Sequence, residues 1–124
     1  RGCGGAQLPP DRLEQTQWLA TEIRGQVASA EQPPSLSIDG NGHVAGFDGC
    51  NRMAGGLSLE EDGEVRHQKH GWIATQMACV QPTMQLAERY GEALRAARQW
   101  RFDAAFLTLQ DEKGATVLRY QRTY

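Results

Sequence analysis

The residue types that could perform chemistry in this sequence are cysteines and histidines near its middle. Cys50 lies in the glycine-rich run GHVAGFDGCNRMAGG, residues 42–56, and Cys79 lies in ATQMACVQP. His67 and His70 stand between them in HQKH. A cysteine with a histidine as its base could act as a nucleophile, cysteine and histidine together are zinc ligands, and a glycine-rich loop could cradle a phosphate.

Each of these chemistries lacks a supporting pattern. A phosphate cradle leads from a strand into a helix, whereas this run leads into another predicted strand. A zinc site is not favoured, because the spacing of HQKH puts His67 and His70 on opposite faces of a strand. The sequence also lacks two cysteines close together, which are typical of structural zinc sites. We therefore predict no catalytic residue, metal or cofactor. The alternative is a thiol- or zinc-dependent protein that uses Cys50 and Cys79 with His67 and His70.

A structural role explains the glycine-rich run better than a chemical one. Gly46, Gly49, Gly55 and Gly56 flank predicted strands, where glycine marks a bulge, a sharp bend or the close approach of two backbones. A short, strongly curved sheet needs such positions. We predict that the run shapes a sheet.

The composition is that of one soluble globular domain. The chain has 124 residues, of which 40% are hydrophobic and 23% charged, enough for a single core. The net charge is −2 and the basic residues are scattered, so nucleic acid is not an expected partner. We expect a monomer.

The N-terminal residues indicate a tether. In RGCGGAQLPP the small Gly2 precedes Cys3, as at the start of a bacterial lipoprotein whose cysteine is lipidated, although Arg1 departs from that pattern. Residues 1–15 are expected to be a flexible tether and residues 16–124 the folded domain. The expected location is the bacterial periplasm or outer membrane, with membrane contact only through a lipid on Cys3, and the cytoplasm is the less favoured alternative. The alternative is an unmodified cysteine in a tail.

Apolar residues that alternate with polar ones predict a strand over 16–25 and three hairpins. The hairpins cover residues 35–47, 55–68 and 105–120, with turns at DGNG, Asp62-Gly63 and DEKG. A polar connection is predicted over 26–34. These elements predict a mostly antiparallel sheet, curved or forming a partial barrel.

A single amphipathic helix is predicted over 82–100, which makes the fold class α+β. Pro82 suits its first turn, and Gly91 lowers its intrinsic helix propensity, so packing must hold it. The predicted core includes Met53, Met77, Trp72 and Trp100. The alternative for Trp72 is exposure beside His70, where these two residues and Arg52 would form the candidate contact surface.

The two cysteine motifs together resemble the META domain, also called the HslJ-like family, over about residues 16–121. The matching motif residues are Gly49, Cys50, Asn51, Thr75, Met77, Ala78 and Cys79. The resemblance implies a small α+β domain. Many such proteins are secreted or lipid-anchored in the bacterial envelope and associated with stress. It carries over no active-site residue, since no general catalytic activity belongs to the family.

The resemblance also implies that Cys50 and Cys79 lie near one another. In an oxidising compartment they would form a disulfide that stabilises the fold by on the order of 3 kcal/mol; two reduced, buried thiols are the alternative. Asn51 is expected to hydrogen-bond nearby backbone.

The expected function is that of a non-enzymatic, stress-associated envelope protein that binds a protein or a small hydrophobic molecule. A secreted inhibitor that presents the turns at Gly40 to Gly42 and at Gly63 is a further alternative.

Overall fold

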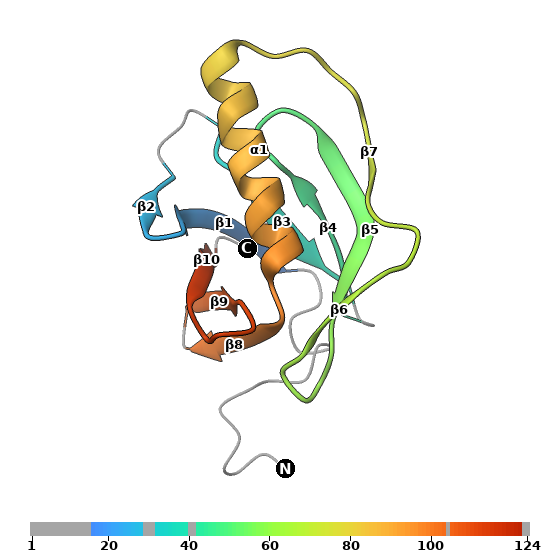
Figure 1. Cartoon of the computed structure of the whole chain (residues 1–124), viewed down its shortest axis with the longest axis vertical. Helices are drawn as coiled ribbons and strands as arrows, with labels where there is room; N and C mark the ends of the chain where they lie inside the picture. The colour runs from blue at the N-terminus through green and yellow to red at the C-terminus, as the bar shows by residue number, and fades with distance from the viewer. Residues whose placement is uncertain (1–15, 29–31, 40–41, 104, 123–124) are drawn as a thin grey trace.

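The computed structural model describes residues 16–28, 32–39, 42–103 and 105–122. Within these ranges it contains one antiparallel sheet and one helix (Figure 1), so the predicted α+β class is confirmed. The predicted tether, residues 1–15, lies outside the described residues. The strands are β1 Thr16–Ile23, β2 Gln26–Val27, β3 Ser35–Ile38, β4 His43–Phe47, β5 Arg52–Leu59, β6 Val65–His67, β7 Ile73–Ala74, β8 Gln99–Asp103, β9 Phe106–Gln110 and β10 Thr116–Arg122, and the helix is α1 Gln81–Ala96.

The sheet curves into a nearly closed barrel. Its strand order is β6-β5-β4-β3-β1-β10-β9-β8, with β2 paired to β1 and β7 paired to β5. The two end strands meet at an antiparallel bridge between Glu64 and Gln99. Beside it, the amide of Val65 donates to the carbonyl of Arg98 at 2.9 Å. The curvature thus removes the free edges that a flat sheet would leave on β6 and β8.

The core fills the inside of this barrel. Trp18 and Trp100 are completely buried, and Trp18 packs edge-on against Phe102 with ring centroids 5.8 Å apart. Four leucines of β5 and β9 are also fully buried in this core: Leu57, Leu59, Leu107 and Leu109. Trp100 and Met53 are in the core as predicted, whereas Met77 is 59% exposed and that prediction is wrong.

The helix α1 packs across the sheet against β1 and β10, as Figure 1 shows. Its buried residues are Tyr90, Ala93 and Leu94, the apolar face that the helical spacing predicts. The prediction that it continues to residue 100 is wrong, because Ala97 has an extended backbone and β8 begins at Gln99. Trp100 and Phe102 alternate with exposed residues at period two, so their burial requires a strand.

Two short strands have no counterpart in the sequence prediction. The start of the predicted connection over 26–34 forms β2, which folds back on β1 through Arg24 and Gly25, both with positive φ. β7 pairs with β5 through Met53 and Ala54. Two-residue strands carry no periodic pattern, so propensity could not reveal them.

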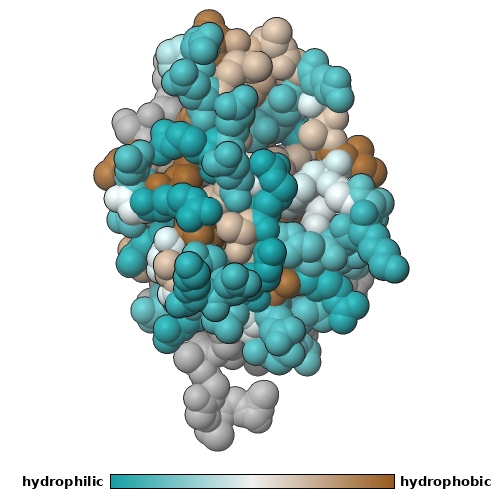
Figure 2. Space-filling view, in the orientation of Figure 1, coloured by the Kyte–Doolittle hydropathy of each residue, from teal (hydrophilic) through white to brown (hydrophobic). Residues whose placement is uncertain are grey.

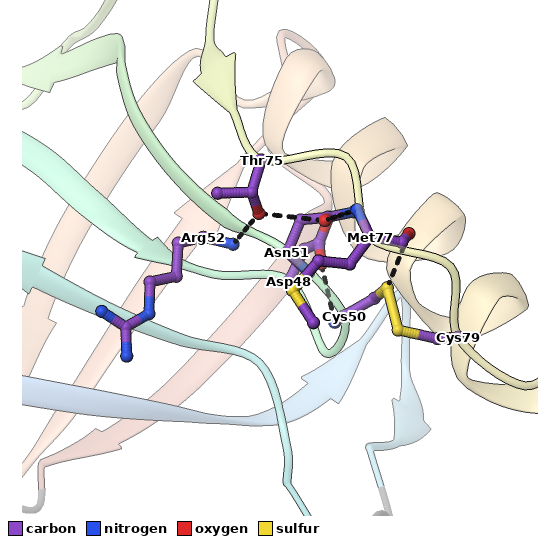
Figure 3. The surroundings of a disulfide bond; sticks show 7 residues. All are labelled: Asp48, Cys50, Asn51, Arg52, Thr75, Met77 and Cys79. Carbon is purple, nitrogen blue, oxygen red and sulfur yellow. Dashed lines mark hydrogen bonds between the residues drawn. A yellow bond between two sulfur atoms is a disulfide. The ribbon is translucent and has the colours of Figure 1, made fainter.

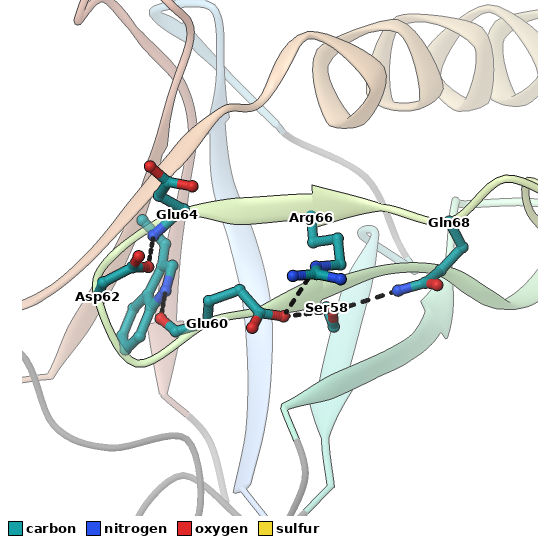
Figure 4. A network of polar contacts seen from close by, with 7 residues as sticks. Ser58, Glu60, Asp62, Glu64, Arg66 and Gln68 are labelled. Atoms are coloured by element: carbon teal, nitrogen blue, oxygen red, sulfur yellow. Dashed lines mark hydrogen bonds and ion pairs between the residues drawn. The ribbon is translucent and has the colours of Figure 1, made fainter.

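A polar network holds the β5–β6 hairpin (Figure 4). Ser58 donates to the Glu60 carboxylate at 3.0 Å and accepts from Gln68 at 3.3 Å. Arg66 lies 3.7 Å from the same carboxylate. The indole of Trp100 donates to the carbonyl of Glu60 at 2.6 Å. This bond connects the hairpin to β8, the strand at the other end of the strand order.

Two buried tyrosines join the helix to the sheet. The hydroxyls of Tyr90 and Tyr120 are 2.7 Å apart, and both side chains are fully buried. Burial raises the pKa of each tyrosine well above its ordinary value. The folded state therefore holds these protons more tightly than the unfolded state does.

The free energy of unfolding should fall as the pH rises above about 10, the pKa of a tyrosine in the unfolded chain. The tyrosine contribution is complete below that pH, because both states are then protonated. Above that pH, each tyrosine lowers the free energy of unfolding by up to about 1.4 kcal/mol per pH unit. Denaturation at a series of alkaline pH values measures the slope. A Tyr90→Phe/Tyr120→Phe variant should show a shallower slope, and an equal slope would contradict the assignment.

Candidate functional site

The two cysteine motifs are joined by a disulfide between Cys50 and Cys79, with an S–S distance of 2.08 Å (Figure 3). This is the pairing that the family resemblance led us to expect. Cys50 is buried in the turn between β4 and β5, and Cys79 lies just before α1. Cys50 Sγ also lies 3.5 Å from the carbonyl oxygen of Met77, a contact without a donated proton, since a disulfide sulfur carries none.

Asn51 forms the second connection between the motifs. Its Oδ1 accepts hydrogen bonds from the hydroxyl of Thr75 at 2.9 Å and from the amide of Met77 at 2.6 Å. Thr75 in turn accepts from the amide of Arg52 at 3.1 Å, and its own amide donates to the carbonyl of Arg52 at 3.0 Å. Asparagine and threonine are therefore used here to hold backbone.

Asp48 shapes the turn that presents these residues. Its Oδ1 accepts from the amides of Cys50 and Asn51 at 2.8 and 2.6 Å, and Gly49 takes a positive φ of 106°. A side chain at Gly49 would be strained in that conformation. We call Asp48, Cys50, Asn51, Thr75, Met77 and Cys79 the disulfide clasp.

Replacing Asn51 with alanine is expected to lower the free energy of unfolding by about 1–3 kcal/mol, because two donors lose their acceptor in a half-buried position. Chemical denaturation measures this loss. Gln76→Ala is the matched control: Gln76 lies between the two donors and is exposed, so its loss should be within about 0.5 kcal/mol. Equal losses in the two variants would contradict a specific role for Asn51.

A cavity of about 560 Å³ opens beside the clasp. We call it the disulfide cleft. Its volume lies within the range of small-molecule sites, roughly 300–1,000 Å³. It is lined by Gln32, Phe47, Gly49, Cys50, Arg52, Thr75, Met77, Cys79, Val80, Thr83 and Leu86.

Large apolar side chains are exposed around this cleft. Met77 and Val80, which line the cleft, are 59% and 70% exposed, and Met84 on the first turns of α1, which does not line it, is 41% exposed. Figure 2 shows apolar surface gathered at the top of the view, around the beginning of α1. A contiguous patch of exposed apolar side chains marks an interaction site more often than scattered single apolar residues do. The sequence prediction missed this surface because it assigned Met77 to the core.

The predicted contact surface of Trp72, His70 and Arg52 is divided in the structure. Trp72 is half-buried and lines a second cavity of about 310 Å³ between the clasp and α1, whereas Arg52 lines the disulfide cleft. Trp72 lies so close to Gly56 that a Cβ there would collide with the indole. His70 is exposed and lies near Gly55.

The structure gives the cysteines and histidines separate surroundings. His67 Nε2 lies 2.7 Å from the carbonyl of Ala97 and 3.1 Å from the guanidinium of Arg98. The described residues contain no group of three or more His, Cys, Asp or Glu side chains that could hold a metal ion.

The helix α1, which is the helix in the described part of the chain, lacks the length and hydrophobicity needed to span a membrane. Gly40 and Asn41, in the turn proposed for an inhibitor, lie outside the described residues, as does Cys3.

Comparison with known proteins gives the same motifs a context. A family model described as the META domain matches residues 11–124. A protein structure solved by NMR is similar at a TM-score of 0.69 and 26% identity, over 93% of this chain and 95% of the other. An NMR structure of a protein from Burkholderia xenovorans has a TM-score of 0.67 and 25% identity, over 99% of this chain and 94% of the other. A search of the curated proteins finds no match.

Proposed function

This chain belongs to the META domain family, and from this we propose that it is a non-enzymatic, stress-associated protein of the bacterial cell envelope that binds a small hydrophobic ligand in the disulfide cleft. The observation that carries the proposal is the cleft of about 560 Å³ with exposed Met77 and Val80 at its border. Methionine adapts its shape to different apolar surfaces, so a border of this kind suits a hydrophobic ligand.

The chemistry of the cleft supports binding without catalysis. Both of its cysteines are joined in the disulfide, so neither offers a thiolate. Thr75 already has its hydroxyl engaged with Asn51 and Arg52. Among the described residues that line the cleft, Arg52 is the one charged side chain, and arginine is a poor general acid or base because it stays protonated.

The disulfide also supports the proposed location. Disulfides persist in oxidising compartments such as the bacterial periplasm. In the proposed arrangement a lipid on Cys3 anchors the chain to the membrane through residues 1–15, and the domain works as a monomer. A protein partner is the competing kind of ligand for the same apolar surface.

Binding can be measured with the neutral fluorescent probe N-phenyl-1-naphthylamine. Its fluorescence should rise on titration with the protein and saturate at one probe per chain. Met77→Asp should weaken the affinity at least about tenfold, because a carboxylate at the border opposes transfer of an apolar probe from water. The side chain of Met77 is mostly exposed, so the fold should tolerate the change.

Ile73→Asp is the matched control. Ile73 is 70% exposed and does not line the disulfide cleft, and the substitution introduces the same charge. This variant should bind the probe as the unchanged protein does. If the probe does not bind, or if both variants lose it equally, the proposed ligand site is wrong and the apolar surface is left for a protein partner.

A further inference from the structure

We propose that the ligand of the disulfide cleft is a single-chain amphiphile with an anionic head group, a carboxylate or a comparable anion, which Arg52 binds. This inference rests on the proposed function and adds the charge and orientation of the ligand. The apolar chain lies against the disulfide and its neighbouring apolar side chains, and the head group meets the guanidinium.

The cleft has one polar end and one apolar end. Figure 3 shows the Arg52 side chain extending away from the Cys50–Cys79 disulfide, while both line the same cavity. Phe47, the cross-strand partner of Arg52 in the β4–β5 pair, also lines it. On the side of the helix α1, Leu86 adds a further apolar side chain to the lining of the cleft. An elongated molecule with a charge at one end matches this arrangement.

Arg52 is positioned but not neutralised. Its backbone amide and carbonyl are both fixed by Thr75, so the base of the side chain is held by the disulfide clasp. The residue is exposed, and within the described part of the chain its guanidinium has no hydrogen bond or ion pair. A guanidinium pairs with a carboxylate or phosphate through parallel hydrogen bonds, which fixes the sign of the expected ligand charge.

The walls of the cleft do not oppose a negative charge. None of the described lining residues is acidic, and the first turn of α1 contains no acidic residue. Asp48 of the clasp and Glu88 of the helix line the second cavity instead. Asp48 also has its Oδ1 engaged with two backbone amides. An anion in the cleft therefore meets an arginine without a competing carboxylate among the described lining residues.

The test compares decanoate, decanol and decyltrimethylammonium, which share a ten-carbon chain and differ in head-group charge. Isothermal titration calorimetry at low salt should show decanoate binding about fivefold to tenfold more tightly than decanol, with decyltrimethylammonium weakest. Arg52→Gln should reduce the affinity for decanoate to that for decanol and leave decanol binding unchanged, which also shows that the variant is folded. Arg52→Lys should retain part of the preference.

Arg101→Gln removes the same charge from β8, where Arg101 is exposed and does not line the cleft. It should leave the preference for decanoate intact. Equal binding of decanoate and decanol, or an equal effect of Arg52→Gln and Arg101→Gln, would overturn the role of Arg52 while keeping the proposed function. Failure of all three ligands to bind would overturn both. Binding to phosphatidylglycerol vesicles without binding of decanoate would also overturn the inference, since it would indicate a membrane surface and not a free amphiphile.

Discussion

Gly46→Ala is expected to lower the free energy of unfolding by about 3 kcal/mol, near the top of the usual range for overpacking. A Cβ at Gly46 would collide with the carbonyl oxygen of Ser35 and lie 3.2 Å from the Cα of Leu36. Both atoms are backbone and cannot rotate away. β3 would have to move from β4 at a place where the two strands are paired through Ser35 and Phe47.

Chemical denaturation of the oxidised protein measures this effect, and Gly91→Ala is its matched control. In the helix, a Cβ at Gly91 would approach only the guanidinium of Arg95, at 3.3 Å, and this flexible group can shift. Because alanine favours the helix, Gly91→Ala should be stabilising by up to about 1 kcal/mol. A loss below about 1 kcal/mol for Gly46→Ala, too small for overpacking, would contradict the close approach of β3 and β4.

Removing the disulfide is the second large effect. Cys50 and Cys79 are 29 residues apart, and the chain-entropy model gives about 3.5 kcal/mol for a cross-link that closes a loop of that length. The Cys50→Ala/Cys79→Ala variant should lose about this much free energy of unfolding. Its disulfide cleft should also bind N-phenyl-1-naphthylamine more weakly, because the segment before α1 would then be held by hydrogen bonds to Asn51 and Arg52 without a covalent link.

A reductant provides the control for this prediction. Treatment with tris(2-carboxyethyl)phosphine should destabilise the unchanged protein toward the variant and leave the variant unaffected. Mass spectrometry after alkylation without reduction should find Cys50 and Cys79 protected. Two alkylated thiols at these positions, or an unchanged free energy of unfolding in the variant, would contradict a structural disulfide.

Much of the fold follows from local patterns in the sequence. The predicted hairpins over 35–47, 55–68 and 105–120 correspond to β3–β4, β5–β6 and β9–β10, because their turns and alternation are both local signals. The end of the helix was predicted wrongly because residues 97–100 continue the helical spacing, whereas the sheet buries Trp100 from a strand. Closure of the barrel depends on contacts between Glu64 and Gln99, which are too far apart in sequence for a local pattern to reveal.

The candidate site was predictable only in part. The family resemblance of the two motifs implied that Cys50 and Cys79 lie near one another, and the position of Asn51 in a tight corner suggested that it hydrogen-bonds nearby backbone. Met77 lines the cleft and is mostly exposed, whereas its residue type alone predicts a place in the core. The absence of acidic side chains from the described lining of the cleft is a property of the folded arrangement and has no signature in the sequence.

The central claim, a hydrophobic ligand in the disulfide cleft, is tested most directly by NMR of methyl-¹³C methionine. The chain has three methionines: Met77 lines the disulfide cleft, and Met53 and Met84 line the second cavity. On titration with decanol, the methyl signal of Met77 should shift and saturate at one ligand per chain, while the signal of the buried Met53 stays in place. Saturable shifts at Met53 and Met84 with none at Met77, or no shift at any of the three, would contradict the claim.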